Sequence, residues 1–98
     1  MSYQATLNVC VFDNNGQVIV DGNGNSIAQA DPDPRYQGSD PPATTVGPDG
    51  CVSFVLTDLS GSTSYDVNAC CVGYTPQSQR VTFSSPSIKS VTFYLNPV

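Results

Sequence analysis

Residues 3–12 read YQATLNVCVF and alternate between apolar and polar side chains along their whole length. The apolar members are Tyr3, Ala5, Leu7, Val9 and Val11. A period of two residues predicts a strand with one face on a core and the other toward solvent. Folds compatible with this chain must therefore hold one long, half-buried strand near the N-terminus.

Further strand-like segments follow, and turn residues separate them. Strands are predicted at 17–20, 27–30, 51–57, 65–72, 78–83 and 90–95. β-branched and aromatic residues are frequent and Glu is absent, a composition that suits half-buried pleated surfaces. Seven or so short strands between turn signals are typical of a sandwich or small barrel. We therefore expect residues 1–98 to form a single all-β domain, an antiparallel β-sandwich of the Ig-like or prealbumin-like kind.

Residues 31–50 interrupt this pattern with five prolines and three glycines. Proline removes a donor from a strand ladder, so the segment is predicted to be a long surface loop. Loops of this length often carry function, although a plain connection between two sheets fits the composition equally well.

Two stretches, 11–19 (VFDNNGQVI) and 48–83, carry motifs that resemble carboxypeptidase regulatory-like and Cna-B-type domains. The matching positions are Asp13, Gly16, Asp49, Gly50, Phe54, Leu59, Gly61, Tyr65, Val67, Gly73 and Tyr74. The resemblance implies a prealbumin-like, or transthyretin-like, sandwich serving as a stalk, spacer, adhesin segment or filament subunit. Val52 departs from the usual aromatic residue. The isopeptide bond of some Cna-B-type domains is not expected, because the first strand lacks lysine, Lys89 lies near the other end and Glu is absent.

Four cysteines, Cys10, Cys51, Cys70 and Cys71, must be assigned a role. A nucleophile usually needs a neighbouring His or a helix N-terminus, and the chain has no His and no predicted helix. A zinc site usually shows paired C-x2-C knuckles, which are missing here. The even count favours two disulfides formed in an oxidising compartment.

The alternation places Cys71 on the core face of its strand and the other three cysteines on outer faces. A bond between Cys70 and Cys71 would strain the backbone, so each is expected to pair with a distant partner. The pairing stays open, and an outward cysteine could also bond a neighbouring subunit.

Two polar patterns suggest ligands or modification. Asp21, Asn23 and Asn25 alternate like the start of an EF-hand loop, but Ser26 replaces the required glycine and no Glu closes the loop. Turns that satisfy their own backbone explain these residues better, so we expect no metal and no cofactor, with calcium as the alternative. Thr44 and Thr45 lie beside prolines and are candidates for O-glycosylation.

Charge and hydropathy restrict the partners. Eight acidic residues against three basic ones give a net charge of −5, which disfavours binding to nucleic acid and anionic membranes. No apolar run approaches the roughly 18 residues that a membrane span needs. The N-terminus lacks a basic segment followed by an apolar one, so we expect either a signal removed or replaced by Met1, or another exit route, as for a virion component. The expected location is extracellular, at a cell surface or on a virion.

The functional prediction is a non-catalytic structural module. Asp31 and Asp33 are the only candidate catalytic pair, and no His, Glu or nucleophile motif supports them. Strand-like ends can add to a neighbour's sheet and build a head-to-tail homopolymer, so we predict a filament or surface-fibre subunit. The residues that would carry assembly are Ala5, Leu7, Val9 and Val11, or Val91, Phe93 and Leu95.

The alternative is a small module that binds a carbohydrate or a protein receptor through the 31–50 loop. Tyr36 would stack on a sugar ring, and four neighbours would bind its hydroxyls. These neighbours are Asp33, Arg35, Gln37 and Asp40. The absence of Trp weakens this alternative.

Overall fold

The computed structural model describes residues 2–21, 24–32, 39–70 and 73–98, and within these ranges every regular element is a strand. The elements are β1 (Tyr3–Asp13), β2 (Val20–Asp21), β3 (Gly24–Asn25), β4 (Ile27–Pro32), β5 (Thr44–Thr45), β6 (Cys51–Leu59), β7 (Thr63–Cys70), β8 (Gln77–Phe83) and β9 (Ile88–Leu95). The prediction of an all-β chain is confirmed. No helix in the described ranges has the length and apolarity required to cross a membrane.

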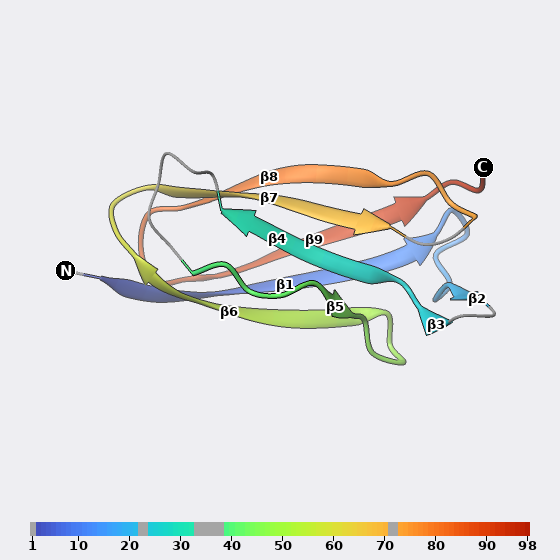
Figure 1. The fold of residues 1–98 in the computed structure, drawn as a ribbon, viewed down its shortest axis with the longest axis horizontal. Helices are drawn as coiled ribbons and strands as arrows, with labels where there is room; N and C mark the ends of the chain where they lie inside the picture. Colours follow the sequence, from blue (N-terminus) through green and yellow to red (C-terminus); the bar gives the residue numbers. More distant parts are fainter. Residues whose placement is uncertain (1, 22–23, 33–38, 71–72) are drawn as a thin grey trace.

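Two sheets face each other across one core, an arrangement compatible with a β-sandwich (Figure 1). One sheet has the strand order β6-β1-β9 and the other β5-β4-β7-β8, while β2 and β3 form a separate pair. The prediction of seven or so strands fits in part, because β2, β3 and β5 contain only two residues each. The body measures 44 × 22 × 20 Å, and the long strands run along its longest dimension.

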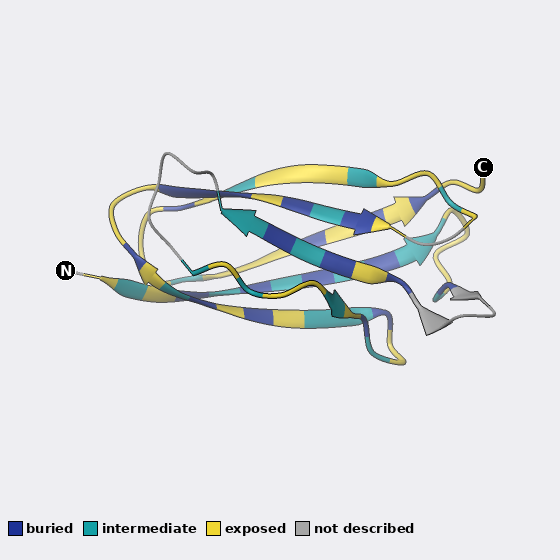
Figure 2. Ribbon diagram, in the orientation of Figure 1, coloured by how far each residue is buried: buried dark blue, intermediate teal, exposed yellow. Residues whose placement is uncertain are grey.

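The core follows from the alternation in the long strands, which Figure 2 shows as bands of buried and exposed residues. In β1 the four inward residues from Ala5 to Val11 are at most 4% exposed. The largest fully buried side chains are Tyr65, Phe83, Phe93, Leu7, Leu56, Leu59 and Leu95. Each such apolar side chain contributes about 1.5–3 kcal/mol when it leaves water.

The pairing of β9 corrects the prediction of a purely antiparallel fold. β1 pairs antiparallel with β6, but β9 runs parallel to β1 on its other side. The reason is the short connection 84–87, which takes the chain from β8 in one sheet to β9 in the other and reverses its direction (Figure 1). Because β8 runs opposite to β1, β9 must run with it. The connection is too short for a crossover within one sheet, so the parallel strand enters from the facing sheet.

Aspartates fix the turns that carry the motifs noted in the sequence. The Asp13 carboxylate accepts hydrogen bonds from the amides of Asn15 (2.8 Å) and Gln17 (3.0 Å). The Asp49 carboxylate accepts one from the Cys51 amide (3.1 Å). Both are Asx turns, in which a short carboxylate satisfies backbone donors that the turn leaves free.

The proline-rich segment is not a loop from end to end. β4 continues through Asp31 and Pro32, and Thr44–Thr45 form β5 beside β4. The Val46 amide donates to the Ser26 carbonyl (2.9 Å), so the even-numbered residues of β4 turn their backbone groups away from β7. Pro32 falls at such a position, where the missing N–H removes nothing from the β4–β7 ladder. Residues 33–38 lie outside the described part of the chain.

Candidate functional site

The two terminal strands predicted to carry assembly occupy different places in the sheet. β1 lies between β6 and β9, and its residues Ala5, Leu7, Val9 and Val11 are buried in the core. β9 lies at the edge of the same sheet. Its inward residues Val91, Phe93 and Leu95 are also buried, so they hold β9 to the core while its outer edge faces away from β1.

Backbone direction in β9 follows from one hydrogen bond. The Thr6 amide donates to the Ser87 carbonyl (2.9 Å), so odd-numbered residues of this stretch turn their backbone groups toward β1. The even-numbered residues from Ile88 to Tyr94 therefore point theirs away from β1. Among the described strands, none forms a ladder with this outer edge.

Two glutamine side chains of β8 cover part of that edge. Gln77 Nε2 donates to the Tyr94 carbonyl (2.7 Å), and Gln79 Nε2 donates to the Thr92 carbonyl (3.4 Å). On the same side, Lys89 Nζ donates to the Thr82 carbonyl (2.5 Å) and lies 5.4 Å from the centre of the Phe83 ring. Between β8 and β9 themselves, the described hydrogen bonds come from side chains. Just beyond the two strands the backbone takes over: the Thr75 amide donates to the Asn96 carbonyl (2.8 Å), and the Val98 amide donates to the Gly73 carbonyl (3.0 Å). The outward backbone N–H groups of β9 are thus left free for another strand.

The sequence interpretation missed this role of the glutamines. Gln77 and Gln79 share their strand parity with Val81 and Phe83, and Phe83 is fully buried. Glutamines on the core-facing side of an edge strand could have predicted such contacts, because a side-chain amide that is turned away from water needs a hydrogen-bond partner. This pattern does not identify β9 as that partner.

On the side away from β8 and β9, Ser39 links β6 of one sheet to β7 of the other. Its amide donates to the Thr57 carbonyl (2.9 Å), and its hydroxyl oxygen accepts from the Thr57 amide (2.9 Å). Its carbonyl accepts from the Tyr65 hydroxyl (2.6 Å). Farther along, the Gly47 amide donates to the Cys51 carbonyl (2.9 Å). Residues 39–47 are therefore fastened to both ends of the outer edge of β6, which blunts that edge against pairing.

The buried Tyr65 hydroxyl makes this closure sensitive to alkali. Burial raises the pKa of Tyr65 above its usual value of about 10, the hydrogen bond with Ser39 opposes this, and the negative charge of Asp40 adds to it. A raised folded-state pKa favours the folded protein below pH about 10, and this contribution falls as the pH rises through the folded pKa.

We therefore expect Tyr65→Phe to lower the free energy of unfolding by about 1–2 kcal/mol at neutral pH, because the Ser39 carbonyl loses its donor. Above pH about 10 the difference from the wild type should shrink. The wild-type phenol ionises more readily in the unfolded state than in the folded state, so the free energy of unfolding falls with pH in the wild type alone. Urea unfolding from pH 7 to 11.5 measures both effects. Tyr94→Phe, at an exposed ring, is the control, and a Tyr65→Phe curve parallel to the wild type at all pH values would contradict this account.

One disulfide is present among the described cysteines. Cys10 and Cys51 are directly opposite each other on β1 and β6, with Cα atoms 4.0 Å apart and their sulfurs bonded. Val11 and Gly50 share a ladder hydrogen bond, so the cysteines form the neighbouring pair without one, where side chains approach most closely. A second disulfide stays a prediction: Cys70 is free and exposed on the outer face of β7 in the single chain. Its strand parity leaves it no partner across the core, and Cys71 lies outside the described residues.

The proposed ligand loop is described only at its end. Asp33, Arg35, Tyr36 and Gln37 lie outside the described residues, whereas Asp40 is described and exposed. The grouping of these residues at one site therefore stays a prediction.

The structure describes both candidates for O-glycosylation but only part of the candidate calcium site. Thr44 and Thr45 form β5; the Thr44 hydroxyl donates to the Pro42 carbonyl (3.0 Å), and Thr45 is exposed. Asn23 lies outside the described residues, and the side chains of Asp21 and Asn25 are not among those described. Within the described residues, no group of three or more His, Cys, Asp or Glu is placed to hold a metal ion.

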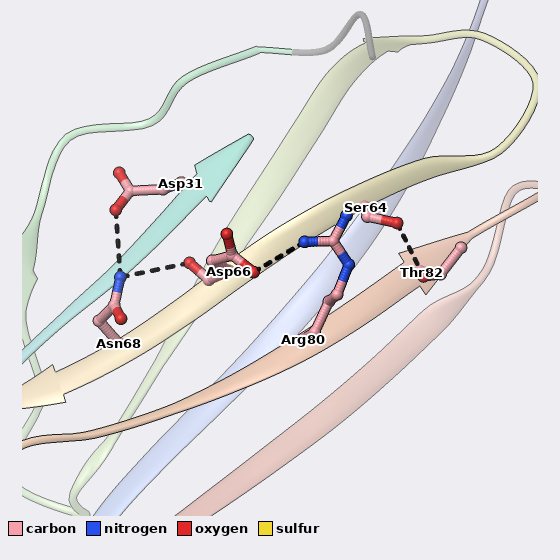
Figure 3. Close-up of polar contacts among 6 residues, drawn as sticks. All are labelled: Asp31, Ser64, Asp66, Asn68, Arg80 and Thr82. Atoms are coloured by element: carbon pink, nitrogen blue, oxygen red, sulfur yellow. Dashed lines mark hydrogen bonds and ion pairs between the residues drawn. The ribbon is translucent and has the colours of Figure 1, made fainter. Parts of the chain in front are cut away.

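Polar residues on the outer face of β4, β7 and β8 form one network (Figure 3). Asp31 and Asp66 are paired across β4 and β7, an unfavourable position for two like charges. Asn68 Nδ2 donates to the Asp31 carboxylate (3.1 Å), and Arg80 forms an ion pair with Asp66 (3.1 Å). Asp31, the described member of the candidate catalytic pair, is thus engaged in a strand-surface contact.

Comparison with known proteins adds no family to this description. A scan against models of protein families and a search of curated protein sequences found no match to the chain.

Proposed function

We propose that the protein is a non-catalytic structural module that self-assembles into a filament or surface fibre. Neighbouring copies would join by strand addition, and the disulfide would stabilise each subunit. The module would act outside the cell, at a cell surface or on a virion, and its fold would be of the prealbumin-like kind.

The observation that supports this proposal most is the unpaired outer edge of β9. It lies at the edge of its sheet and has no ladder partner in the described chain. Side chains of Gln77 and Gln79 cover part of it, and backbone hydrogen bonds with residues 73–75 begin only beyond the end of β9. A strand from a neighbour would replace the glutamine contacts with main-chain hydrogen bonds, which is how β-augmentation gives affinity. β1 is the less suitable strand, because it already has neighbours on both sides.

The polar residues support a structural role. Asp13 and Asp49 cap turns, Asp31 accepts a hydrogen bond from Asn68, and Asp66 pairs with Arg80. Each of these carboxylates satisfies a partner of its own fold. The disulfide joins two strands of one sheet, and its formation suits an oxidising exterior.

A proline at position 90 tests strand addition. The Ser90 amide faces away from β1, so Ser90→Pro removes a donor that the fold itself does not use. We expect the variant to remain folded but to lose filament growth in negative-stain microscopy and sedimentation.

Ser90→Ala is the matched control, because it changes the side chain and keeps the amide. It should assemble like the wild type. Filaments of unchanged length and abundance from folded Ser90→Pro would rule out addition at the β9 edge.

A further inference from the structure

The outer face of the β6-β1-β9 sheet carries no charge over most of its length. Its residues are Gln4, Thr6, Asn8, Cys10, Phe12, Cys51, Ser53, Val55, Ile88, Ser90, Thr92 and Tyr94, which we call the uncharged face. Asp58, in the bulge near the end of β6, lies beyond it. The outer face of the other sheet carries Asp31, Asp66 and Arg80. Charge is thus segregated between the two faces of a protein whose net charge is −5.

The uncharged face exposes apolar side chains at both ends. At one end Val55 and Ile88 flank Thr6 and are 61% and 73% exposed. They line a hollow of about 550 Å³, which is also lined by Gln4, Ala5, Thr6, Pro86 and Ser87. At the other end Tyr94 is 54% exposed, and its ring centre lies 6.0 Å from that of Phe12. The hollow at Thr6 and Ile88 and the aromatic pair of Phe12 and Tyr94 lie at equal distances along the strands from the Val9–Val91 pair.

We infer that the uncharged face binds the same face of a second copy, with a two-fold axis near the middle of β1. The axis would place Tyr94 of each copy at the hollow beside Val55 and Ile88 of the other, as an isologous contact requires. Two copies with a net charge of −5 each repel, and this face brings them together without placing like charges in contact.

The size of the face sets the strength of the contact. Three strands about 4.8 Å apart and about eight residues long cover roughly 400 Å² in projection. This is about half of the roughly 800 Å² that each partner buries in a standard interface. The pairing is therefore weak and depends on concentration. It rests on the proposed function as a second contact: strand addition extends a filament, and the uncharged faces join two such filaments side by side.

Introducing a charge tests the contact. Val55→Asp and Tyr94→Asp each place a carboxylate at one end of the face, and each should weaken pairing at least tenfold. Thr45→Asp adds the same charge to an exposed residue of β5 and should leave pairing unchanged. Sedimentation velocity between about 10 µM and 1 mM measures the dimer, and negative-stain microscopy measures filament width.

The outcomes separate the two proposals. Paired assemblies in the wild type and Thr45→Asp, with single filaments or monomers in both face variants, support the inference. Pairing that survives in either face variant overturns the inference. Wild-type filaments that are one molecule wide also overturn the inference, but they leave strand addition in place. Dimers without filaments leave the inference standing and refute strand addition. Wild-type monomers at every concentration refute both.

Discussion

Replacing both Cys10 and Cys51 by serine should lower the free energy of unfolding by about 3–4 kcal/mol. The disulfide joins residues 41 apart in the chain, and closing a loop of that length removes about 4 kcal/mol of entropy from the unfolded state. For a domain of this size the loss corresponds to a fall in melting temperature of roughly 15–20 °C. The fold should persist, because the bond links a pair that shares no ladder hydrogen bond, and the β1–β6 ladder remains.

Cys70→Ser is the control for this measurement. The thiol is free and exposed, so its replacement should change stability by less than about 0.5 kcal/mol. A double variant that lost less than about 1 kcal/mol would show that the disulfide does little for this fold. Adding a reductant to the wild type should reproduce the effect of the double variant.

Gly50→Ala should cost about 2–3 kcal/mol, for two separate reasons. Gly50 has φ of +84°, a conformation that costs an L-residue about 1–2 kcal/mol. A Cβ at this position would also lie 2.8 Å from Cε1 of Phe12 and 3.2 Å from the Val11 carbonyl oxygen. The Phe12 ring packs against Tyr94, so its movement adds to the cost. Thermal and urea unfolding measure the loss.

Gly61→Ala separates the two causes. Gly61 has φ of +60°, but an added Cβ meets nothing within 4 Å. It should therefore show the conformational cost alone, about 1 kcal/mol. Equal losses at the two positions would mean that Phe12 and the Val11 carbonyl move aside freely, which contradicts the packing described here.

The positions of the strands were largely predictable, because alternation is a local property. The segment 3–12 became β1 (Tyr3–Asp13), and 51–57 became β6 (Cys51–Leu59). The parity of Cys70 was also predicted correctly: it is exposed, while Val67 and Ala69 beside it are buried. Burial of one face selects these patterns whatever the topology.

The long-range relations could not be predicted from the same patterns. The parallel direction of β9 depends on the passage of the chain from one sheet to the other at 84–87. The disulfide between Cys10 and Cys51 depends on the register of β6 against β1, and four cysteines allow three pairings. The closure by Ser39 also needed the structure, because the segment's composition indicates only that it is a poor central strand.

The closures on the two sides of the sheets differ in a way that bears on assembly. Residues 39–47 hold the β6 edge through main-chain and side-chain hydrogen bonds, including the buried Tyr65 hydroxyl. Along β9 the edge is covered through side chains of Gln77 and Gln79, and backbone hydrogen bonds close it only beyond the strand, at Asn96 and Val98. A neighbour's strand therefore meets less competition at β9, which is why we place strand addition there.

Negative-stain microscopy of the purified, non-reduced protein across a range of concentrations tests self-assembly most directly. Fibres should grow in number and length with concentration, and their repeat should match one dimension of the 44 × 22 × 20 Å body. Discrete single molecules at every concentration would contradict the proposal that this chain is a structural subunit.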